Sequence, residues 1–445
     1  MHKQTYFGAR LSAASVSSPS GAPAMLAPRR AVARASALLA ASLLACAFPA
    51  HAQNAQNAQD SSLSWKLSGF GTLGVAHSDE RSADFTASVL RKDGAGHTHP
   101  WSMDVDSRLG AQLDLGMGSW SAVVQVVSEQ RLDGGYRPEV EWANVKYQLT
   151  PEIALRAGRI ALPVFLAAEY RKVGYALPWV RTPVDVYGTL PISASDGVDA
   201  TWRWSTGAVR HNTQVLAGRT DRELANGLKI RAGDIRGISH SFEYGALSGR
   251  VTAFGGRLST GIGRELFDAL RQFGPAGNAL ADRHAIENKR VRMLSAGASY
   301  DPGPWFVTAE YGQTRTSSLL GDGTSMYVGA GLRRGAFTPY AGYAQVRSDG
   351  PTSDPGLPTT GLPPPLAGAA QQLNAGLNTF LSTIPVQSTW SAGVRWDAAP
   401  DIALKLQFDH VRPQDGSRGT LINQQPDFRS GRAFGIASVA LDFVF

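Results

Sequence analysis

The sequence has little of three features that mark common classes of protein. Its single cysteine in 445 residues, Cys46, excludes a disulfide-rich scaffold. Charged residues make up only 18% of the chain, less than the roughly 25% of an average soluble domain. Beyond residue 52 no apolar run approaches the ~18 residues that predict a membrane-spanning helix. The composition therefore argues against a small disulfide-linked protein and against a helical membrane protein.

A net charge of +7 suggests a nucleic-acid-binding protein, but the excess lies at the N-terminus. Residues 1–52 hold five basic residues and no acidic one, which leaves 38 basic and 36 acidic residues in the rest of the chain. The remainder is nearly balanced, so nucleic acid is not an expected partner.

Residues 1–52 have the organisation of a secretory leader. Three arginines between positions 29 and 34 precede a short apolar run, and the small-x-small sequence Ala50-His51-Ala52 follows it. The apolar run is too short to cross a bilayer as a helix. The Ser-, Ala- and Pro-rich stretch ahead of it suggests that translation starts at Met25. We therefore expect an exported protein.

Cys46 offers a second processing possibility, because it follows Leu-Leu-Ala and so resembles a lipoprotein cleavage site. Leucine is unusual directly before the small residue, and Ala-His-Ala is the better site. Cleavage there leaves no cysteine, which excludes thiol catalysis and Cys-ligated metals. Residues 53–62 are then a polar lead-in, and residues 63–445 form one large domain.

From Leu63 onwards the dominant period of the sequence is two, as in strands with one apolar and one polar face. The clearest case is Trp101–Leu115, where the odd positions are mostly apolar and the even positions are mostly charged or polar. Fifteen alternating residues predict a strand much longer than the usual 5–6 residues of a globular sheet.

Eight long polar segments alternate with seven short turn sequences along this region, which predicts sixteen strands in up-and-down order. An even strand number with long loops at one end and short turns at the other is the layout of an all-β, antiparallel transmembrane barrel. A secreted β-sandwich or propeller also has many strands. Strand lengths of 10–15 residues, near the ~9–11 needed to cross a bilayer, favour the barrel, as do the tryptophans at the strand ends.

The sequence resembles the sixteen-stranded porins of Gram-negative outer membranes. Ala440–Phe445 resembles their C-terminal assembly signal, which ends in an aromatic residue, here Phe445. Leu155–Arg159, Gly174–Trp179 and Val186–Gly188 are similar to segments of a proteobacterial porin-like group. This resemblance implies an outer-membrane location, passive diffusion of small hydrophilic solutes or ions, a homotrimer, contact with lipopolysaccharide and insertion by the barrel assembly machinery.

In such porins the third outer loop folds into the barrel and narrows the pore, and the corresponding segment here is residues 163–196. Its charges are mixed, whereas cation-preferring members carry an acidic cluster. The predicted constriction residues, on this loop and on the adjoining strands, are Lys146, Arg156, Glu169, Arg171, Lys172, Arg181 and Asp185. The loop is also rich in apolar and aromatic side chains, which could contact an amphipathic solute; anchoring of the loop against the wall is the favoured interpretation.

A sixteen-stranded barrel encloses water, so its inward-facing charges set the field that a solute meets. The period-two register turns thirteen basic and eight acidic side chains inward, including Lys229 and Arg231. This excess predicts a weak anion preference. The main pore-lining candidates are Arg108, Arg203, Arg250, Arg395 and Lys405. Arg159 points outward by the same rule.

No enzyme motif is found. Asp409 and His410 are adjacent on a strand and so point to opposite faces. His97 and His99 could hold a metal only adventitiously, because nothing completes a site. We therefore expect no catalytic residues and no cofactor. The alternative function is a plugged barrel that acts as an adhesin or structural protein. A helix is predicted at Arg264–Arg271, and Ser348–Val386 is expected to be mobile.

Overall fold

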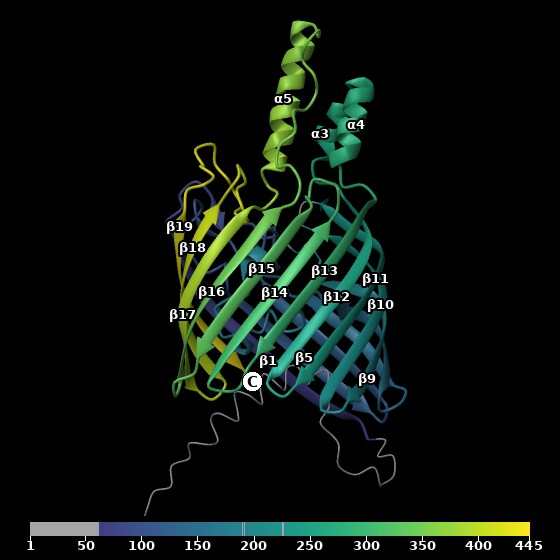
Figure 1. Ribbon diagram of the computed structural model, residues 1–445, viewed down its shortest axis with the longest axis vertical. Coiled ribbons are helices and arrows are strands. Elements are labelled where there is room, and N and C mark those ends of the chain that lie inside the picture. The colour runs from purple at the N-terminus through teal and green to yellow at the C-terminus, as the bar shows by residue number, and fades with distance from the viewer. Residues whose placement is uncertain (1–61, 189, 191, 225–226) are drawn as a thin grey trace, which may run out of the picture.

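A computed structural model describes residues 62–188, 190, 192–224 and 227–445. The predicted leader, Met25 and Cys46 lie outside these residues. Within them, sixteen long antiparallel strands form one closed barrel, with short turns at one end and long loops at the other (Figure 1). The strands are β1 (Ser64–Ser78), β5 (Arg108–Met117), β6 (Trp120–Glu129), β7 (Glu139–Gln148), β8 (Ile153–Ala161), β9 (Ala194–Thr206), β10 (Val209–Glu223), β11 (Lys229–Tyr244), β12 (Leu247–Thr260), β13 (Lys289–Tyr300), β14 (Trp305–Arg315), β15 (Gly323–Leu332), β16 (Phe337–Ser348), β17 (Gln387–Ala399), β18 (Ile402–Pro413) and β19 (Phe434–Val444). The prediction of an all-β barrel is confirmed.

The barrel closes where β19 pairs with β1, from Phe70↔Val444 to Ser78↔Ile436. Phe445 extends this seam, because its amide donates to the carbonyl oxygen of Gly69 at 3.1 Å and its own carbonyl accepts from the Gly69 amide at 2.9 Å. The Phe445 ring lies over Gly69, where a Cβ atom would be 2.1 Å from the ring. The terminal aromatic residue is thus part of the closure of the barrel.

The strands form because alternate residues face lipid-like and aqueous surroundings. Leu67 and Leu73 of β1, Leu406 of β18 and Val328 of β15 are exposed on the outer face. The residues between them point inward and are largely polar or small. Aromatic pairs lie beside the short turns, for example Tyr300 with Trp305 and Phe337 with Trp396. These pairs form part of the aromatic girdle expected where a barrel meets a membrane interface.

The long strand predicted at Trp101–Leu115 is wrong in its first half. Only Trp101–Ser102 is strand (β4), residues 103–107 turn, and β5 begins at Arg108. The turn carries Asp106 into the barrel, where its carboxylate pairs with Arg181 from the inward loop. A tertiary ion pair therefore overrides a local alternation that would have continued the strand.

A bulge in β11 corrects the predicted facing of Lys229 and Arg231. The register shifts between Gly233 and Arg236, where Asp234 has a positive φ of 53°. One extra residue reverses the alternation. Lys229 and Arg231 consequently pair with Glu223 and Asp221 on the outer face, and they do not face the lumen.

Helices α3 (Arg264–Arg271), α4 (Gly274–His284) and α5 (Pro364–Leu381) project from the long-loop end, opposite the C-terminus (Figure 1). The predicted helix at Arg264–Arg271 is confirmed. The expectation of a mobile Ser348–Val386 segment is wrong, because α5 packs Leu377 and Leu381 into a buried cluster with Phe267 and Leu280. None of the described helices is long and apolar enough to cross a membrane.

Asp354 joins these helices. Its carboxylate accepts from His284 Nε2 at 2.9 Å and pairs with Arg283 at 3.0 Å, while its backbone is held by Asn378 of α5. Burial raises the pKa of Asp354, but the hydrogen bonds from His284, the Gly356 amide and Arg283, together with the charge of His284, outweigh it. The pKa of Asp354 is therefore lower than its ordinary value.

We expect acid to release this contact. A lowered carboxyl pKa stabilises the fold above the ordinary Asp value of ~3.9, and the contribution is lost as pH falls through the lower folded value. Asp354→Asn should imitate this at neutral pH and speed amide exchange in α5. Hydrogen–deuterium exchange measures it, with Asp282→Asn as the control, because Asp282 makes only an exposed pair with Arg271. Equal exchange in α5 for both variants would contradict the role of Asp354.

Candidate pore constriction

The segment between β8 and β9 folds into the barrel. It contains η1 (Gly174–Ala176) and α2 (Val184–Tyr187). Its residues 163–188 make hydrogen bonds to side chains of β6, β7, β12, β13, β14, β17, β18 and β19. Within the described residues, none of the hydrogen bonds of this inward loop reaches β8, β9, β10 or β11. The loop is therefore hydrogen-bonded to one side of the wall only, and the side that receives none of these bonds is called the uncovered side below. Close to the base of the loop, Leu216 of β10 and Ile230 of β11 are nevertheless buried in the same apolar cluster as Val164.

Arg181 is the most heavily bonded residue of the inward loop. Its guanidinium donates to both carboxylate oxygens of Asp106 at 2.8 and 2.6 Å, to Asp409 at 2.8 Å and to the Ser438 hydroxyl at 2.6 Å. The Arg181 side chain is 3% exposed, and the ring of Phe85 lies 5.2 Å from its charged centre. Two buried carboxylates thus depend on one buried cation.

Lys172 forms a second bridge from the inward loop to the wall. Its ammonium lies 2.9 Å from Glu129 of β6 and 2.8 Å from Glu141 of β7. Glu129 also pairs with Arg91 from the preceding long loop at 2.7 Å. Two carboxylates and two cations balance here, so this cluster adds little net charge to the pore. Arg171, beside Lys172, is partly exposed.

Two wall cations bind the backbone of the inward loop. Lys405 of β18 donates to the carbonyl oxygens of Gly174 at 2.7 Å and Trp179 at 3.0 Å, and pairs with Asp442 at 2.8 Å. Arg395 of β17 donates to the carbonyl oxygens of Tyr175 and Leu177 at 2.5 and 3.0 Å. The Lys405 side chain is 0% exposed. Lys405 therefore anchors the loop and does not line the aqueous lumen, contrary to the prediction.

Arg250, Glu169 and Asp185, which were also predicted to face the pore, form bonds between the loop and the wall. Arg250 of β12 pairs with Glu169 at 2.9 Å and donates to the carbonyl oxygen of Phe165 at 2.8 Å. Asp185 is buried and accepts from Gln387 at 3.2 Å. These contacts orient the loop. Arg250 and Asp185 are largely covered, whereas the Glu169 side chain stays 37% exposed.

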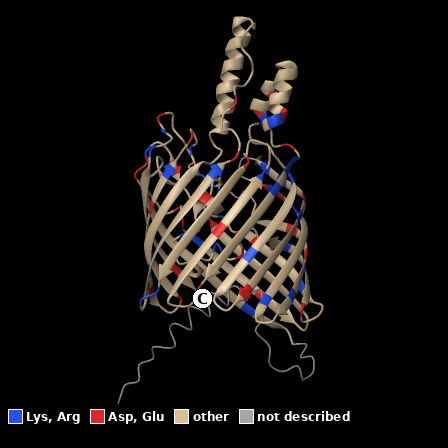
Figure 2. Ribbon diagram, viewed as in Figure 1, with Lys and Arg blue, Asp and Glu red and all other residues tan. Residues whose placement is uncertain are grey.

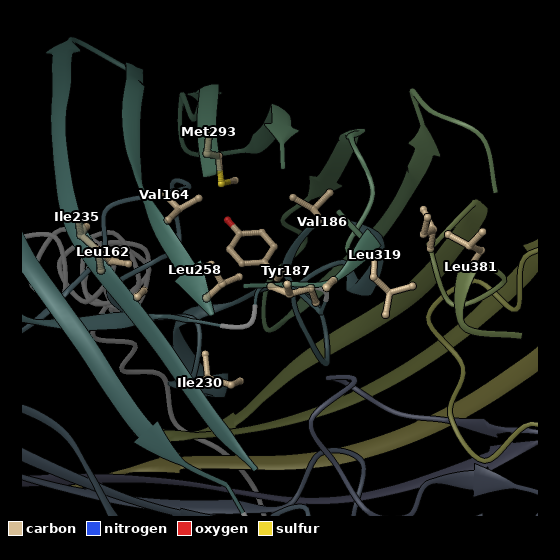
Figure 3. Close-up of a cluster of buried hydrophobic side chains, with 14 of the residues drawn as sticks. Leu162, Val164, Val186, Tyr187, Ile230, Ile235, Leu258, Met293, Leu319 and Leu381 are labelled. Atoms are coloured by element: carbon tan, nitrogen blue, oxygen red, sulfur yellow. The ribbon is translucent and has the colours of Figure 1, made fainter. Parts of the chain in front are cut away.

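Apolar packing completes the anchorage, which supports the favoured interpretation of the loop's aromatic residues. Leu162, Val164, Val186 and Tyr187 lie in one buried cluster with wall residues such as Met293 (Figure 3). The Tyr187 hydroxyl also donates to Glu310 of β14 at 2.5 Å. The cluster leaves few apolar side chains of this loop for contact with an amphipathic solute.

Two wall glycines allow this close approach. A Cβ atom at Gly312 would lie 2.8 Å from the Phe165 ring, and one at Gly329 would lie 2.8 Å from the Trp179 ring. Both are inward positions on adjacent strands, β14 and β15. Inward glycines on neighbouring strands were the sequence signal for the part of the wall against which the loop packs. Reasoning from charge alone missed this signal.

The uncovered side of the lumen is basic. Lys146 of β7 and Arg156 of β8 are direct cross-strand neighbours on the inner face, and Arg156 pairs with Asp199 of β9 at 2.8 Å. The Asp199 side chain is 1% exposed, whereas Arg156 is 31% exposed. Arg203 follows on the inner face of β9. A solute on this side therefore meets mainly cations.

Two further predicted residues lie apart from this group. Arg108 begins β5 and donates to the backbone carbonyl of Asp106 at 3.1 Å. Arg159 points outward, as the register predicted, and forms a bidentate ion pair with Asp196, with hydrogen bonds of 2.8 and 2.9 Å. Basic and acidic residues are interspersed along the strands and at the long-loop rim (Figure 2).

A closed barrel of sixteen strands, narrowed by an inward loop that is bound to one wall, defines a water-filled outer-membrane channel. A family model for Gram-negative porins matches residues 35–421. The chain belongs to the Gram-negative porin family, which places it in the bacterial outer membrane. A search of curated proteins found no match.

Solved structures agree with this fold. The chain is similar to an anion-selective porin from Comamonas acidovorans, with a TM-score of 0.52 and 13% identity, covering 86% of this chain and 100% of that one. It is also similar to the outer membrane channel DcaP of Acinetobacter baumannii, with a TM-score of 0.51 and 11% identity, covering 88% of this chain and 100% of that one. At these identities the likeness concerns the fold alone.

Proposed function

We propose that this porin is a passive diffusion channel for small hydrophilic solutes, with a weak preference for anions. The observation that carries the proposal is the asymmetry of the lumen. The loop's cations are neutralised by carboxylates of the wall, while Lys146 and Arg156 lie opposite each other on the uncovered side, where Arg156 pairs with the buried Asp199. Inward charges bias the ions that a wide pore admits. The anion selectivity of the similar Comamonas porin is in keeping with this assignment.

Single-channel recording in planar bilayers tests the proposal. Stepwise openings are expected, followed by a reversal potential in a KCl gradient that favours chloride. Absence of openings would support the alternative, a plugged barrel that acts as an adhesin or structural protein. Openings with a reversal potential that favours potassium would retain the channel and reject the anion preference. Liposome swelling with sugars, phosphate and carboxylic acids would then rank the solutes.

We further propose that residues 1–52 are an export leader and that residues 53–62 are a short polar lead-in to the barrel domain, residues 63–445. The barrel assembly machinery would recognise the strand that ends at Phe445, and the working form would be a homotrimer. The closing contacts of Phe445 with Gly69 support the proposed role of this last strand in barrel assembly. N-terminal sequencing of the mature protein and its mass in mild detergent test the leader and the trimer.

Lipopolysaccharide is the proposed partner of an arginine belt on the outer face, made of Arg236, Arg257, Arg290, Arg292 and Arg315. Arg257 lies opposite Arg290, and Arg292 lies opposite Arg315. Like charges directly opposite each other destabilise a sheet unless an anion lies between them. Among the described residues, Arg236, Arg290 and Arg292 make no ion pair and are exposed. Lipid phosphates at the long-loop end supply the matching charge.

Replacement of Arg236, Arg290 and Arg292 together by alanine is expected to weaken lipopolysaccharide binding about a hundredfold. Each basic residue near an anionic lipid surface contributes about 1 kcal/mol, and three such losses are about two orders of magnitude in affinity. Native mass spectrometry of the purified protein measures retained lipopolysaccharide. Lys229→Ala with Arg231→Ala is the matched control, because both cations already have carboxylate partners on the same face. Equal retention by both variants would remove the belt as a binding site.

A further inference from the structure

Four aromatic rings are stacked on the outer face of β9, β10 and β11, and two of them are histidines. Trp202 and Trp204 have ring centroids 5.3 Å apart, Trp204 and His211 3.9 Å, and His211 and His240 5.3 Å. His211 Nδ1 and His240 Nε2 are separated by 3.3 Å. The pore does not use this group, because it lies on the side of the wall that faces away from the lumen.

The register fixes that facing. His211 lies opposite Trp204, and His240 lies opposite Thr213, so all four share the face on which Trp202 and Val215 are exposed. The inward positions of the same strands hold Arg210 and Glu243, which pair with each other at 2.5 Å. His211 is the third residue of β10, directly after the short turn between β9 and β10. The pair is therefore at the water boundary of the short-turn end and not at mid-height of the barrel.

The separation of the two nitrogens suits a shared metal ion. Zinc–imidazole bonds of about 2.0–2.1 Å in tetrahedral geometry place two ligand nitrogens about 3.3 Å apart. Two neutral imidazoles also hydrogen-bond at this distance, so a metal would replace one proton between the rings. The nitrogens come from adjacent strands of a rigid wall, which lowers the ordering cost of binding.

Thr213 orients one of the two rings. Its hydroxyl oxygen lies 2.9 Å from His240 Nδ1 and 3.4 Å from Trp204 Nε1, which can only donate. If His240 Nδ1 carries the proton and donates it to Thr213, the lone pair of Nε2 is free on the side of His211. Metal-binding histidines usually give their second nitrogen such a hydrogen-bond partner.

We propose that His211 Nδ1 and His240 Nε2 bind a divalent first-row transition metal ion, with water in the remaining positions. Imidazole suits copper, nickel and zinc, with copper bound most tightly, whereas magnesium and calcium prefer oxygen ligands. Among the residues that the structure describes, no third His, Cys, Asp or Glu joins the pair. The site is accordingly an open one that exchanges metal with the surrounding solution.

Copper titration of the untagged protein in detergent tests this site. Electron paramagnetic resonance should report one bound Cu²⁺ per chain with two nitrogen ligands, and Zn²⁺ should compete while Mg²⁺ should not. His211→Asn and His240→Asn should each abolish the two-nitrogen signal. His77→Asn is the matched control, because His77 also contacts an aromatic ring, that of Trp101 at 4.5 Å, but pairs with no second histidine among the described residues.

Two more variants distinguish the role of Thr213 from that of Trp204. Thr213→Val should weaken copper binding about tenfold while keeping both nitrogens in the spectrum. Trp204→Phe should keep the spectrum and remove most of the copper-induced quenching of tryptophan fluorescence, because Trp204 stacks directly on His211. An unchanged β-sheet circular dichroism spectrum shows that each variant is folded, and it keeps this test independent of the proposed pore function.

Three results would overturn the proposal. One is a two-nitrogen signal that survives in both His211→Asn and His240→Asn. Another is a signal that disappears in a His97→Asn, His99→Asn double variant, which would assign the copper to the outer loop. Absence of bound Cu²⁺ at tenfold excess over protein would likewise reject the site and leave the rings as a hydrogen-bonded part of the aromatic girdle.

Discussion

Replacement of Arg181 by methionine is expected to lower the free energy of unfolding by about 3–5 kcal/mol, the usual cost of removing one partner from a buried ion pair. Methionine fills much of the space but leaves Asp106 and Asp409 buried without their shared cation. Those carboxylates must then take up protons or admit water. The inward loop should loosen from the wall, so single-channel conductance should rise and its open-state noise should increase.

Urea unfolding of the barrel in lipid vesicles, followed by tryptophan fluorescence, measures the change in stability. Arg171→Met is the matched control, because Arg171 lies on the same loop, is partly exposed and makes no ion pair within 4 Å in the part of the chain that the structure describes. A surface substitution of this kind changes stability by about 0.5 kcal/mol or less. Arg181→Lys should fall between the two, because lysine keeps the charge and loses the forked geometry. Similar stability of all three variants would show that the Arg181 cluster does not hold the loop.

Reversing the charges of Lys146 and Arg156 together is expected to convert a weak anion preference into a cation preference. In water a unit charge about 10 Å from an ion contributes about 0.4 kcal/mol, and salt at 0.1 M reduces this by roughly two thirds. A change of four charge units acts in opposite directions on anions and cations. The chloride-to-potassium permeability ratio should therefore fall about tenfold.

Reversal potentials in a KCl gradient measure this ratio for Lys146→Glu with Arg156→Glu. Lys229→Glu is the control, since Lys229 lies on the outer face beside Glu223 and should leave the ratio unchanged. The effect should shrink at high salt, where screening is stronger. A ratio that stays at the wild-type value in the double variant would mean that ions pass elsewhere in the lumen.

The barrel could be predicted from the sequence because its period of two, its turn spacing and its terminal aromatic residue all repeat along the whole chain. Local breaks in that period could not be predicted. The turn before Arg108 carries the ion pair of Asp106 with a distant segment, and the bulge at Gly233–Arg236 is a register shift between β11 and β12. One bulge was enough to move Lys229 and Arg231 from the predicted lumen to the outer face.

The candidate site was predicted in part. The resemblance to porins identified the inward loop, and charge and register identified the cations around it, including Lys146 and Arg156. Charge and register did not reveal which of these cations bind the loop and therefore do not line the lumen. That distinction depends on pairs far apart in sequence, such as Lys405 with the carbonyl oxygen of Gly174, which no single-sequence pattern encodes. Helix α5 was missed because the prolines and glycines of this segment suggested flexibility, although two of the prolines, Pro364 and Pro365, lie in the first turn of the helix, where proline is tolerated.

The two wall cations that hold the inward loop, Lys405 and Arg395, bind carbonyl oxygens of the loop's main chain. Every amino acid offers such a carbonyl, so these attachments do not depend on which side chains the loop carries at Tyr175 or Leu177. These two attachments would therefore persist when those side chains change, while Arg181 and Lys172 remain necessary as side-chain anchors. Substrate range could change by substitution at such positions, in evolution or by engineering, without a new way of fastening the loop to the barrel.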